Sequence, residues 1–305
     1  MSQSKVKLNI KNVGIVLKPK VVNEYTSVLP NLVSWFKKRK INVSFIDSEE
    51  ERVKKLLKTI PKHISFLSLK ELHHKMDLNI TLGGDGTLLG FARNSDRRSA
   101  PIFGVNMGTL GFITEYAKSE FFEGLESLII GRCEVVKLPL YKVEVKKGRK
   151  SLFTNHFLND TVISKHDISR MFSLSVDNEE ENIFNISGDG LIISSPTGST
   201  AYSLAAGGPI ISPRVQALVL TPICPHSLTH RPIVISDKQS LKVKVPADAE
   251  SVMLTIDGQE VQELPSRCIV EVSKSKSKHV KLIANPQRTY FDTLKSKFTQ
   301  GRRLF

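Results

Sequence analysis

The residues best suited to chemistry form a short glycine loop, Gly83-Gly84-Asp85-Gly86-Thr87. The apolar run 78–82 that precedes it is typical of a buried parallel strand, and apolar residues at helical spacing follow from Leu88. Glycines there let the backbone approach a ligand closely, and the first amides of the helix can bind anionic oxygens. Asp85 would repel a phosphate unless a cation, or a proton to be removed, is also present. The loop therefore indicates phosphoryl transfer, with Asp85 as the catalytic residue.

The elements around this loop alternate between strand and helix. Apolar runs at 13–17, 43–46 and 102–106 read as strands, and the spacing in 28–36, 53–60 and 121–129 predicts helices, with Pro30 in or near a first turn. A second glycine-bearing loop, within Gly104–Phe112, follows the strand 102–106. Ligands of open α/β sheets bind outside the carboxyl ends of strands. The alternation predicts a doubly wound, Rossmann-like parallel sheet.

From Cys133 onward the pattern changes to short β-rich runs, which predict a mostly antiparallel second domain. A chain of 305 residues also favours two domains. We expect an α/β domain over residues 1–132 and a β-rich domain over 133–278. A C-terminal helical segment over 279–305 could pack back on the first domain.

The composition favours anionic ligands, because 44 Lys+Arg against 30 Asp+Glu give a formal net charge of +14. The basic runs are short and lack interleaved aromatic residues, so we expect no nucleic-acid partner. Cys133, Cys224 and Cys268 fit neither a zinc spacing nor a secreted disulfide framework, which predicts buried or inert thiols. No signal peptide and no apolar stretch of about 20 residues is visible, so we expect a cytoplasmic protein without a membrane partner.

A second polar cluster occupies Gly188–Tyr202. An apolar run leads into Pro-Thr-Gly-Ser-Thr, and a short helix is expected to follow, with Ser199 or Thr200 as its N-cap and Gly207 near its end. Hydroxyls and free amides at such a helix start can hold a ribose, an adenine edge or a phosphate. An ordinary capped turn would show the same pattern.

Taken together and in order, several segments resemble the NAD kinase family. They are Gly83–Thr87, Gly104–Phe112, Asn159-Asp160, Gly188–Ala206, Leu220–Ile235 and Asp257–Gln259. The GGDGT loop is weak evidence alone, because lipid kinases of the diacylglycerol kinase type carry a very similar loop and phosphofructokinases a related one. The run PTGSTAYSLAAGGPI combined with LTPICPHSL is far more specific.

The resemblance implies transfer of the γ-phosphoryl of ATP, or of inorganic polyphosphate, to the 2′-hydroxyl of the adenosine ribose of NAD, giving NADP. It implies Asp85 as the catalytic aspartate and the β-rich domain as the NAD-binding one. The NAD ligands that it implies are Asp85, Gly86, Asn159, Asp160, Arg170, Asp189, Thr200, Ala201, Tyr202, Ser203, Leu204, Ala205 and Gln259. A homo-oligomer, dimer or tetramer, is implied by the family alone.

Mg²⁺ or another divalent cation is expected with the donor phosphates. No metal site made of protein side chains is expected, since His226 and His230 lie between prolines without a third ligand nearby.

Some questions stay open at this point. Asp160 stands where many members have Glu, and 185–188 lacks an arginine of some NAD-selective members, so NAD and NADH remain alternatives. No Walker-type loop occurs, and the residues that hold the donor phosphates are not identified. Phe112 could stack on adenine or belong to the core. A lipid kinase and an NAD-binding module without catalysis are the alternative functions.

Overall fold

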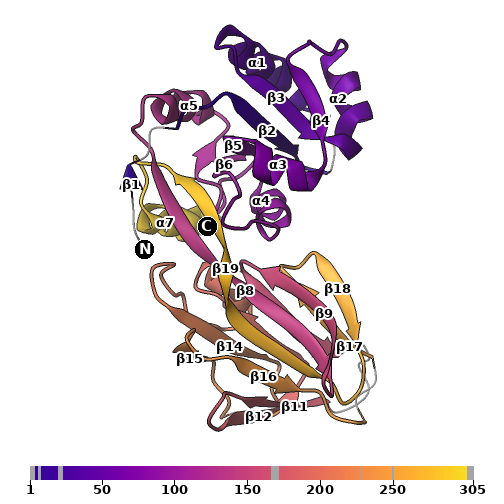
Figure 1. The fold of residues 1–305 in the computed structure, drawn as a ribbon. Coiled ribbons are helices and arrows are strands. Elements are labelled where there is room, and N and C mark those ends of the chain that lie inside the picture. The colour runs from indigo at the N-terminus through magenta and orange to yellow at the C-terminus, as the bar shows by residue number, and fades with distance from the viewer. Residues whose placement is uncertain are drawn as a thin grey trace. The chain divides into compact units, whose positions relative to one another are not determined.

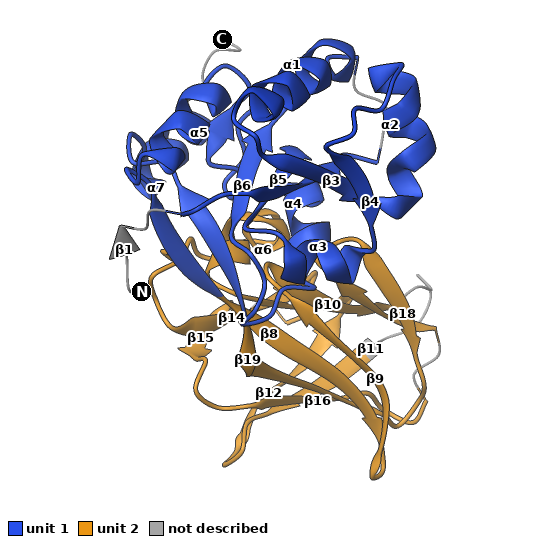
Figure 2. Cartoon of the chain, turned by 45° about the horizontal axis from the view of Figure 1, so that its top comes forward, with its two compact units in different colours: residues 1–138, 279–305 blue, residues 139–278 orange. Residues whose placement is uncertain are grey.

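The computed structural model describes residues 4–5, 8–19, 23–165, 172–227, 229–248 and 251–300, and it divides into two compact units (Figures 1 and 2). Unit 1 comprises residues 1–138 and 279–305, and unit 2 comprises residues 139–278. Two long strands, β8 (Glu134–Lys147) and β19 (Ile269–Ala284), run through the two points where the chain passes from one unit to the other. The C-terminal segment therefore belongs to the same unit as the N-terminal α/β region.

Unit 1 contains a parallel sheet in the order β4-β3-β2-β5-β6-β19, and the strand pairs along this path are parallel. Besides β8 and β19, whose bounds are given above, the strands of this unit are β1 (Ser4–Lys5), β2 (Asn12–Leu17), β3 (Asn42–Ile46), β4 (Ile64–Leu67), β5 (Leu78–Gly83), β6 (Ile102–Asn106) and β7 (Tyr116–Ala117). Its helices are α1 (Tyr25–Lys38), η1 (Asp47–Glu49), α2 (Glu50–Leu57), α3 (Leu69–Lys75), α4 (Asp85–Ala92), α5 (Phe121–Ile129) and α7 (Tyr290–Gln300). Every residue of β5 and β6 is buried, as the apolar runs predict for central parallel strands. The doubly wound α/β prediction is confirmed.

Unit 2 is built from two antiparallel sheets whose inward-facing side chains share one hydrophobic core. One sheet has the order β15-β14-β13-β10-β17-β18, and the other contains β12-β11-β16-β19 with β8 and β9 beyond β19. The strands not yet placed are β9 (Lys150–Phe157), β10 (Asp160–Lys165), β11 (Phe172–Asp177), β12 (Asn182–Gly188), β13 (Gly190–Ser194), β14 (Ala217–Ile223), β15 (Ile233–Ser236), β16 (Leu241–Lys244), β17 (Val252–Ile256) and β18 (Glu260–Leu264). The short helices are η2 (Thr197–Thr200) and α6 (Tyr202–Ala205). The β-rich prediction for this part of the chain is confirmed.

Three local expectations need correction. Helix α1 begins at Tyr25, so Pro30 lies inside the helix and not in its first turn. The expected Ser199 or Thr200 cap does not form: the Ser199 hydroxyl donates to Pro196 O and Ile211 O, and Ala201 is the N-cap residue of α6. Cys133 and Cys268 are buried as expected, but Cys224 is exposed.

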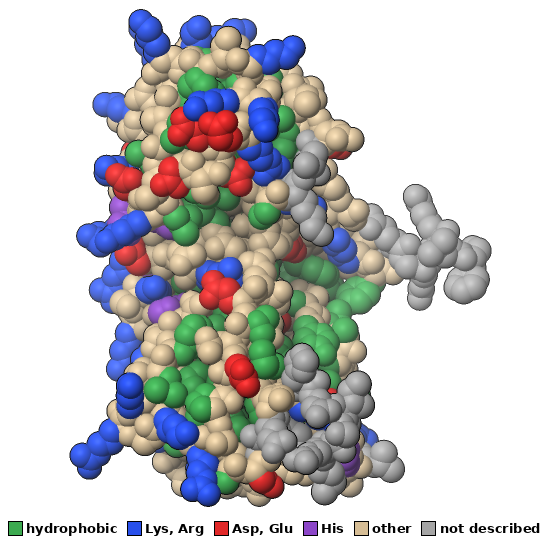
Figure 3. Space-filling model, turned by 90° about the vertical axis from the view of Figure 1, so that its right-hand side faces the viewer, with side chains coloured by type: hydrophobic (Ala, Val, Ile, Leu, Met, Phe, Trp, Pro, Cys, Tyr) green, Lys and Arg blue, Asp and Glu red, His purple; other side chains and the backbone are tan. Residues whose placement is uncertain are grey.

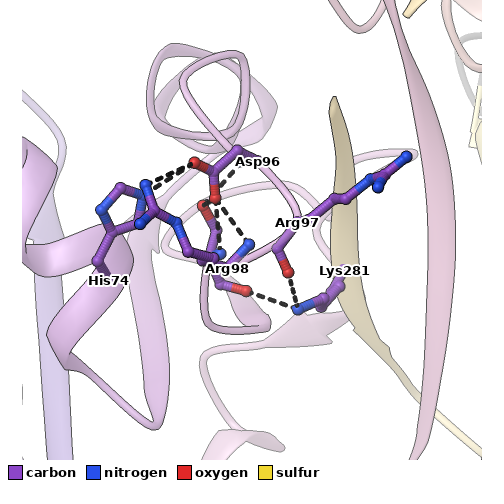
Figure 4. A network of polar contacts seen from close by, with 6 residues as sticks. His74, Asp96, Arg97, Arg98 and Lys281 are labelled. Carbon is purple, nitrogen blue, oxygen red and sulfur yellow. Dashed lines mark hydrogen bonds and ion pairs between the residues drawn. The ribbon is translucent and has the colours of Figure 1, made fainter. Parts of the chain in front are cut away.

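The turn between α4 and β6 is fixed by a polar network (Figure 4). Asp96 Oδ1 accepts the amides of Arg98 and Ser99 at 2.8 and 3.0 Å, and Asp96 Oδ2 lies 3.0 Å from His74 Nε2 of α3. From the other side, Lys281 Nζ of β19 donates to Arg97 O and Ser99 O. The network ties α3, this turn and β19 together, and so fixes where β6 enters the sheet.

No helix among the described residues is long and apolar enough to span a membrane. On the face in Figure 3, Lys and Arg side chains lie along the left edge, at the top and beside Asp and Glu in the middle, and they do not gather in one patch.

The Asp96 network gives a prediction for stability. Asp96→Ala leaves two backbone amides without their acceptor, so the free energy of unfolding should fall by about 1–3 kcal/mol. Urea unfolding followed by the fluorescence of Trp35, the only tryptophan and a residue of α1 in unit 1, measures this. Arg98→Ala is the matched control, because Arg98 is exposed and its guanidinium lies 4.0 Å from Asp96. It should change stability by less than about 0.5 kcal/mol. Equal losses in both variants would contradict the prediction.

Candidate functional site

The glycine loop of the sequence analysis connects the end of β5 to the start of α4. Gly84 is the N-cap residue of α4, and Asp85 is its first residue. A Cβ on Gly83 would overlap the Thr87 side chain, whereas a Cβ on Gly84 would meet within 4 Å only Asn106 Nδ2, at 3.8 Å. The two glycines thus serve different purposes: the first allows the turn to close, and the second leaves open space beside Asp85.

The Asp85 carboxylate is held by the loop that follows β6. Its Oδ1 accepts hydrogen bonds from the amides of Ile113 and Thr114 at 3.3 and 3.0 Å and from Thr114 Oγ1 at 2.9 Å. From the residues that the structure describes, its Oδ2 accepts one hydrogen bond, from the Phe112 amide at 2.8 Å. Because a carboxylate oxygen has two lone-pair directions, Oδ2 keeps one for a ligand hydroxyl. Asp85 therefore organises the loop and can still accept a proton.

Asn106, at the end of β6, fixes the loop that contacts Asp85. Its side-chain amide donates to Thr114 Oγ1 at 2.9 Å, and its Oδ1 accepts the Gly108 amide at 2.8 Å. A Cβ on Gly111 would overlap the Asp85 carboxylate, so only glycine fits there. Sequence reasoning singled out this loop for its glycines but missed the positioning roles of Asn106 and Thr114.

A cavity of about 610 Å³ opens beside Asp85 within unit 1. Its lining residues are Lys18, Asn23, Glu24, Gly83, Gly84, Asp85, Asn106, Met107, Gly108, Thr109, Gly111 and Lys297. It combines the glycine loop, the loop after β6 and one residue of the C-terminal helix α7.

Glu115, next to Thr114, is a partly buried acid close to Asp85. Burial raises the pKa of its carboxyl to about 7, and the nearby Asp85 charge acts in the same direction. The Asn285 amide, 3.4 Å from Glu115 Oε2, and the Arg288 guanidinium act against this rise. Near neutral pH the Glu115 carboxyl is therefore partly protonated, which reduces the negative charge close to Asp85.

Unit 2 has its own cavity, of about 410 Å³, at one face of its six-stranded sheet. It is lined by Asn159, Asp160, Val162, Ser164, Ala201, Tyr202, Thr255, Asp257 and Gly258. The sequence-predicted residues Asn159, Asp160, Ala201 and Tyr202 are thus brought together at one cavity.

Two polar side chains of this cavity, those of Asn159 and Asp160, are buried. Asn159 is 8% exposed, and its Oδ1 has no hydrogen-bond partner among the residues that the structure describes. Asp160 is 4% exposed; burial raises the pKa of its carboxyl to about 7, with a further contribution from the Asp257 charge. Burying such acceptors is costly unless a ligand donates hydrogen bonds to them. The pair is suited to hydroxyl or amine donors of a polar ligand.

Asp257, in the turn between β17 and β18, positions this pair. Its Oδ1 accepts the amides of Leu158, Asn159 and Asp160 at 3.2, 2.8 and 3.2 Å. The family resemblance included the segment Asp257–Gln259, but the ligand that it implied there was Gln259. The pair Asp257-Gly258 is a local signal for a turn. Its contact with Asn159 joins residues 98 positions apart, so no local pattern in the sequence indicates it.

The other described residues that the sequence predicted as NAD ligands are not in the lining of this cavity. Gly86 is exposed beside Asp85, and Gln259 lies in the turn next to Gly258. Ser203 is buried, 2.8 Å from Thr221 Oγ1, and Thr200, Leu204 and Ala205 flank the lining residues Ala201 and Tyr202. Asp189 forms an ion pair with Lys165 at 2.9 Å and is not part of the lining. Arg170 lies outside the described residues.

Phe112 is half-buried, with Lys297 Nζ 5.9 Å from its ring centroid. Within the described part of the chain, no group of three or more His, Cys, Asp or Glu side chains could hold a metal ion. A divalent cation would therefore depend largely on ligands from a bound substrate.

Two family models match the chain: the ATP-NAD kinase N-terminal domain over residues 13–133 and the ATP-NAD kinase C-terminal domain over residues 158–284. The NAD kinase of Solibacter usitatus is 38% identical over 294 residues, which cover 96% of this chain and 99% of that protein. The NAD kinase of Trichlorobacter lovleyi is 36% identical over 280 residues, covering 90% and 94%.

Solved structures agree with these matches. The crystal structure of yeast NADH kinase complexed with NADH superposes with a TM-score of 0.82 at 25% identity, covering 92% of this chain and 84% of that one. An NAD kinase from Archaeoglobus fulgidus in complex with ATP shares the fold, with a TM-score of 0.71 at 21% identity over 94% and 98% of the two chains. With both domain models matched in order and relatives similar over almost their whole length, the chain belongs to the ATP-NAD kinase family.

Proposed function

We propose that this protein transfers the γ-phosphoryl group of ATP to the 2′-hydroxyl of the adenosine ribose of NAD, with Asp85 as the general base. The family assignment carries the reaction, and the observation that carries the role of Asp85 is its free lone-pair direction on Oδ2 beside an open cavity. A hydroxyl proton becomes acidic late in a loose phosphoryl-transfer transition state, so a positioned carboxylate can accept it then. The family assignment also removes the lipid-kinase alternative.

The adenosine part of NAD is assigned to the cavity of unit 2. Asn159 Oδ1 and the Asp160 carboxyl supply buried acceptors that suit ribose hydroxyls or an adenine amine. Ala201 and Tyr202 line the same cavity, and Tyr202 is 48% exposed there, so its ring can cover a bound base. Gly86, Thr200, Ser203, Leu204, Ala205 and Gln259 complete the proposed NAD-binding segment, and Arg170 and Asp189 are proposed as further ligands.

Mg²⁺ or another divalent cation fits the cavity of unit 1 as a companion of the donor phosphates. Glu24 is the carboxylate in its lining that would contact the ion, because the free oxygen direction of Asp85 is kept for the substrate hydroxyl. Bound there, the cation would offset the charge of the phosphates. Inorganic polyphosphate is the alternative donor.

Two further parts of the proposal concern the cell and the assembly. Three cysteines without a disulfide among the described residues support a reducing compartment, and we assign the protein to the cytoplasm. The outer strands of the six-stranded sheet expose Val234 of β15 and Val261 of β18, which supports self-association into a dimer or tetramer.

Asp85→Asn tests the base. Asparagine keeps the shape and can still accept hydrogen bonds from Thr114, but it cannot take up the proton, so turnover should fall by about 10²–10⁴-fold. NAD binding, measured by calorimetry, should stay close to that of the parent protein. NADP formation from ATP, Mg²⁺ and NAD is the assay, and unchanged Trp35 fluorescence controls for folding. Turnover like that of the parent protein would remove Asp85 from this role.

The raised pKa of Glu115 predicts a pH-dependent stability. The folded protein keeps the Glu115 proton up to about pH 7, whereas the unfolded chain loses it near the ordinary value of 4.5. Between these values the folded state binds more protons, so this group makes the free energy of unfolding fall as pH rises, by at most about 1.4 kcal/mol per pH unit. Glu115→Gln should remove that contribution, as measured by urea unfolding with Trp35 fluorescence from pH 4.5 to 7.5. Identical pH slopes for the two proteins would contradict the assignment.

A further inference from the structure

Two lysine side chains line the cavity beside Asp85 and have no part in the mechanism so far. Lys18 follows β2 near the start of the chain, and Lys297 lies in α7 near its end. The sequence analysis found no Walker-type loop and left the residues that hold the donor phosphates unidentified. The structure brings these two distant lysines to one cavity.

Positive charge slightly exceeds negative charge at this cavity. Lys18 and Lys297 face Asp85 and Glu24 in its lining, and Lys118 Nζ lies 3.9 Å from Glu24, so three ammonium groups stand against two carboxylates. The ammonium groups of Lys18 and Lys297, by contrast, form no ion pair or hydrogen bond with any residue that the structure describes. Two such groups facing one cavity favour an anion.

Hydrogen bonds of Arg288, shortly before α7, position the helix that carries Lys297. Arg288 donates to Glu115 O at 2.9 Å and to Glu120 Oε1 at 2.7 Å. The helix that follows places Lys297 Nζ over the ring of Phe112, whose amide donates to Asp85 Oδ2. The ammonium group therefore lies beside the loop that holds the catalytic carboxylate.

The cavity has room for a ligand against the backbone. A Cβ on Gly108 would meet within 4 Å only Asn106 Oδ1, at 3.8 Å, and Gly84 is similarly open. Backbone that is free of side chains can approach phosphate oxygens closely. A chain of two or three linked phosphates, with several negative charges, matches two lysine charges and this open backbone.

We propose that Lys18 and Lys297 bind the terminal phosphates of the phosphoryl donor, so that the C-terminal helix completes the donor site. The inference rests on the proposed function and identifies the donor-binding residues within it. ATP and inorganic polyphosphate share the chemistry of linked phosphates, and so does the pyrophosphate of NAD. The experiment has to separate these three sources.

Steady-state kinetics of Lys18→Met and Lys297→Met provide the first test. Methionine keeps much of the side-chain length but removes the charge, so each variant should raise the KM for ATP by about 10–100-fold, as expected for a lost charged hydrogen bond. The KM for NAD should change less than about two-fold, because NAD contacts would be untouched. Lys297→Arg should restore most of the ATP affinity. Lys295→Met is the matched control: it lies on the same helix but outside the cavity lining, and its KM for ATP should equal that of the parent protein.

Inorganic tripolyphosphate separates the sources of the phosphate chain. It should compete with ATP in the parent protein, and its inhibition constant should rise in Lys297→Met by a factor similar to that for ATP. Competition with NAD instead, or a rise in the KM for NAD alone, would assign the lysines to the dinucleotide and overturn the proposal. An unchanged KM for ATP in both variants would overturn it as well.

The parent protein separates failure of this inference from failure of the proposed function. If it forms NADP but the lysine variants keep their ATP kinetics, only the donor-site assignment is wrong. If it forms no NADP from ATP or polyphosphate, the proposed function fails, and calorimetric binding of tripolyphosphate to parent and variants still tests the anion site.

Discussion

The structure of unit 1 depends on one carboxylate that holds three consecutive backbone amides. Asp85 accepts from Phe112, Ile113 and Thr114, and this is possible only if the end of β5 and the loop after β6 lie at a fixed register. The parallel pairing that ends with Gly83 opposite Asn106 sets that register, and the Met107 amide closes it by donating to Gly83 O at 2.6 Å. The residue proposed as the general base thus also fixes the conformation of the loop around it.

Unit 2 uses the same physical device for binding. Asp257 gathers the amides of three consecutive residues, 158–160, and thereby fixes Asn159 and Asp160 at the cavity. Both loops are held by hydrogen bonds within the protein itself, and such preorganisation lowers the entropic cost of binding a ligand. The two cavities differ in their polar groups. Among the described residues, the ammonium groups of Lys18 and Lys297 have no ion-pair partner at the cavity of unit 1, whereas Asn159 Oδ1 has no hydrogen-bond donor at the cavity of unit 2. The two cavities are therefore suited to phosphates and to hydroxyl-bearing groups, respectively.

The sequence predicted those features that depend on local patterns. The apolar runs predicted β5 and β6, and the glycines between them marked the loop, because parallel strands and close backbone approaches have strong local signals. The helix α3 was missed although Ser68 and Glu71 form a capping box that the sequence shows openly. The placement of Pro30 was wrong because tertiary contacts override its preference for a first turn: Tyr25 Oη donates to Leu82 O at 2.5 Å and fixes the helix start five residues earlier than the proline.

Positioning roles depend on contacts between distant parts of the chain, and no local pattern contains them. Asp257, Asn106 and Lys297 each look ordinary in sequence, and each acquires its role from a partner that the fold supplies.

The charge balance at Asp85 shows why such partners matter. A carboxylate beside a phosphate chain is repulsive, but three amides and a hydroxyl offset its charge from one side while the lysines face the cavity from the other. The carboxylate still has an oxygen available for the proton of a bound hydroxyl. That arrangement needs residues from the segment after β2, from α4, from the loop after β6 and from α7 at once. The glycine loop could therefore be predicted from a local pattern, but the groups that surround Asp85 could not.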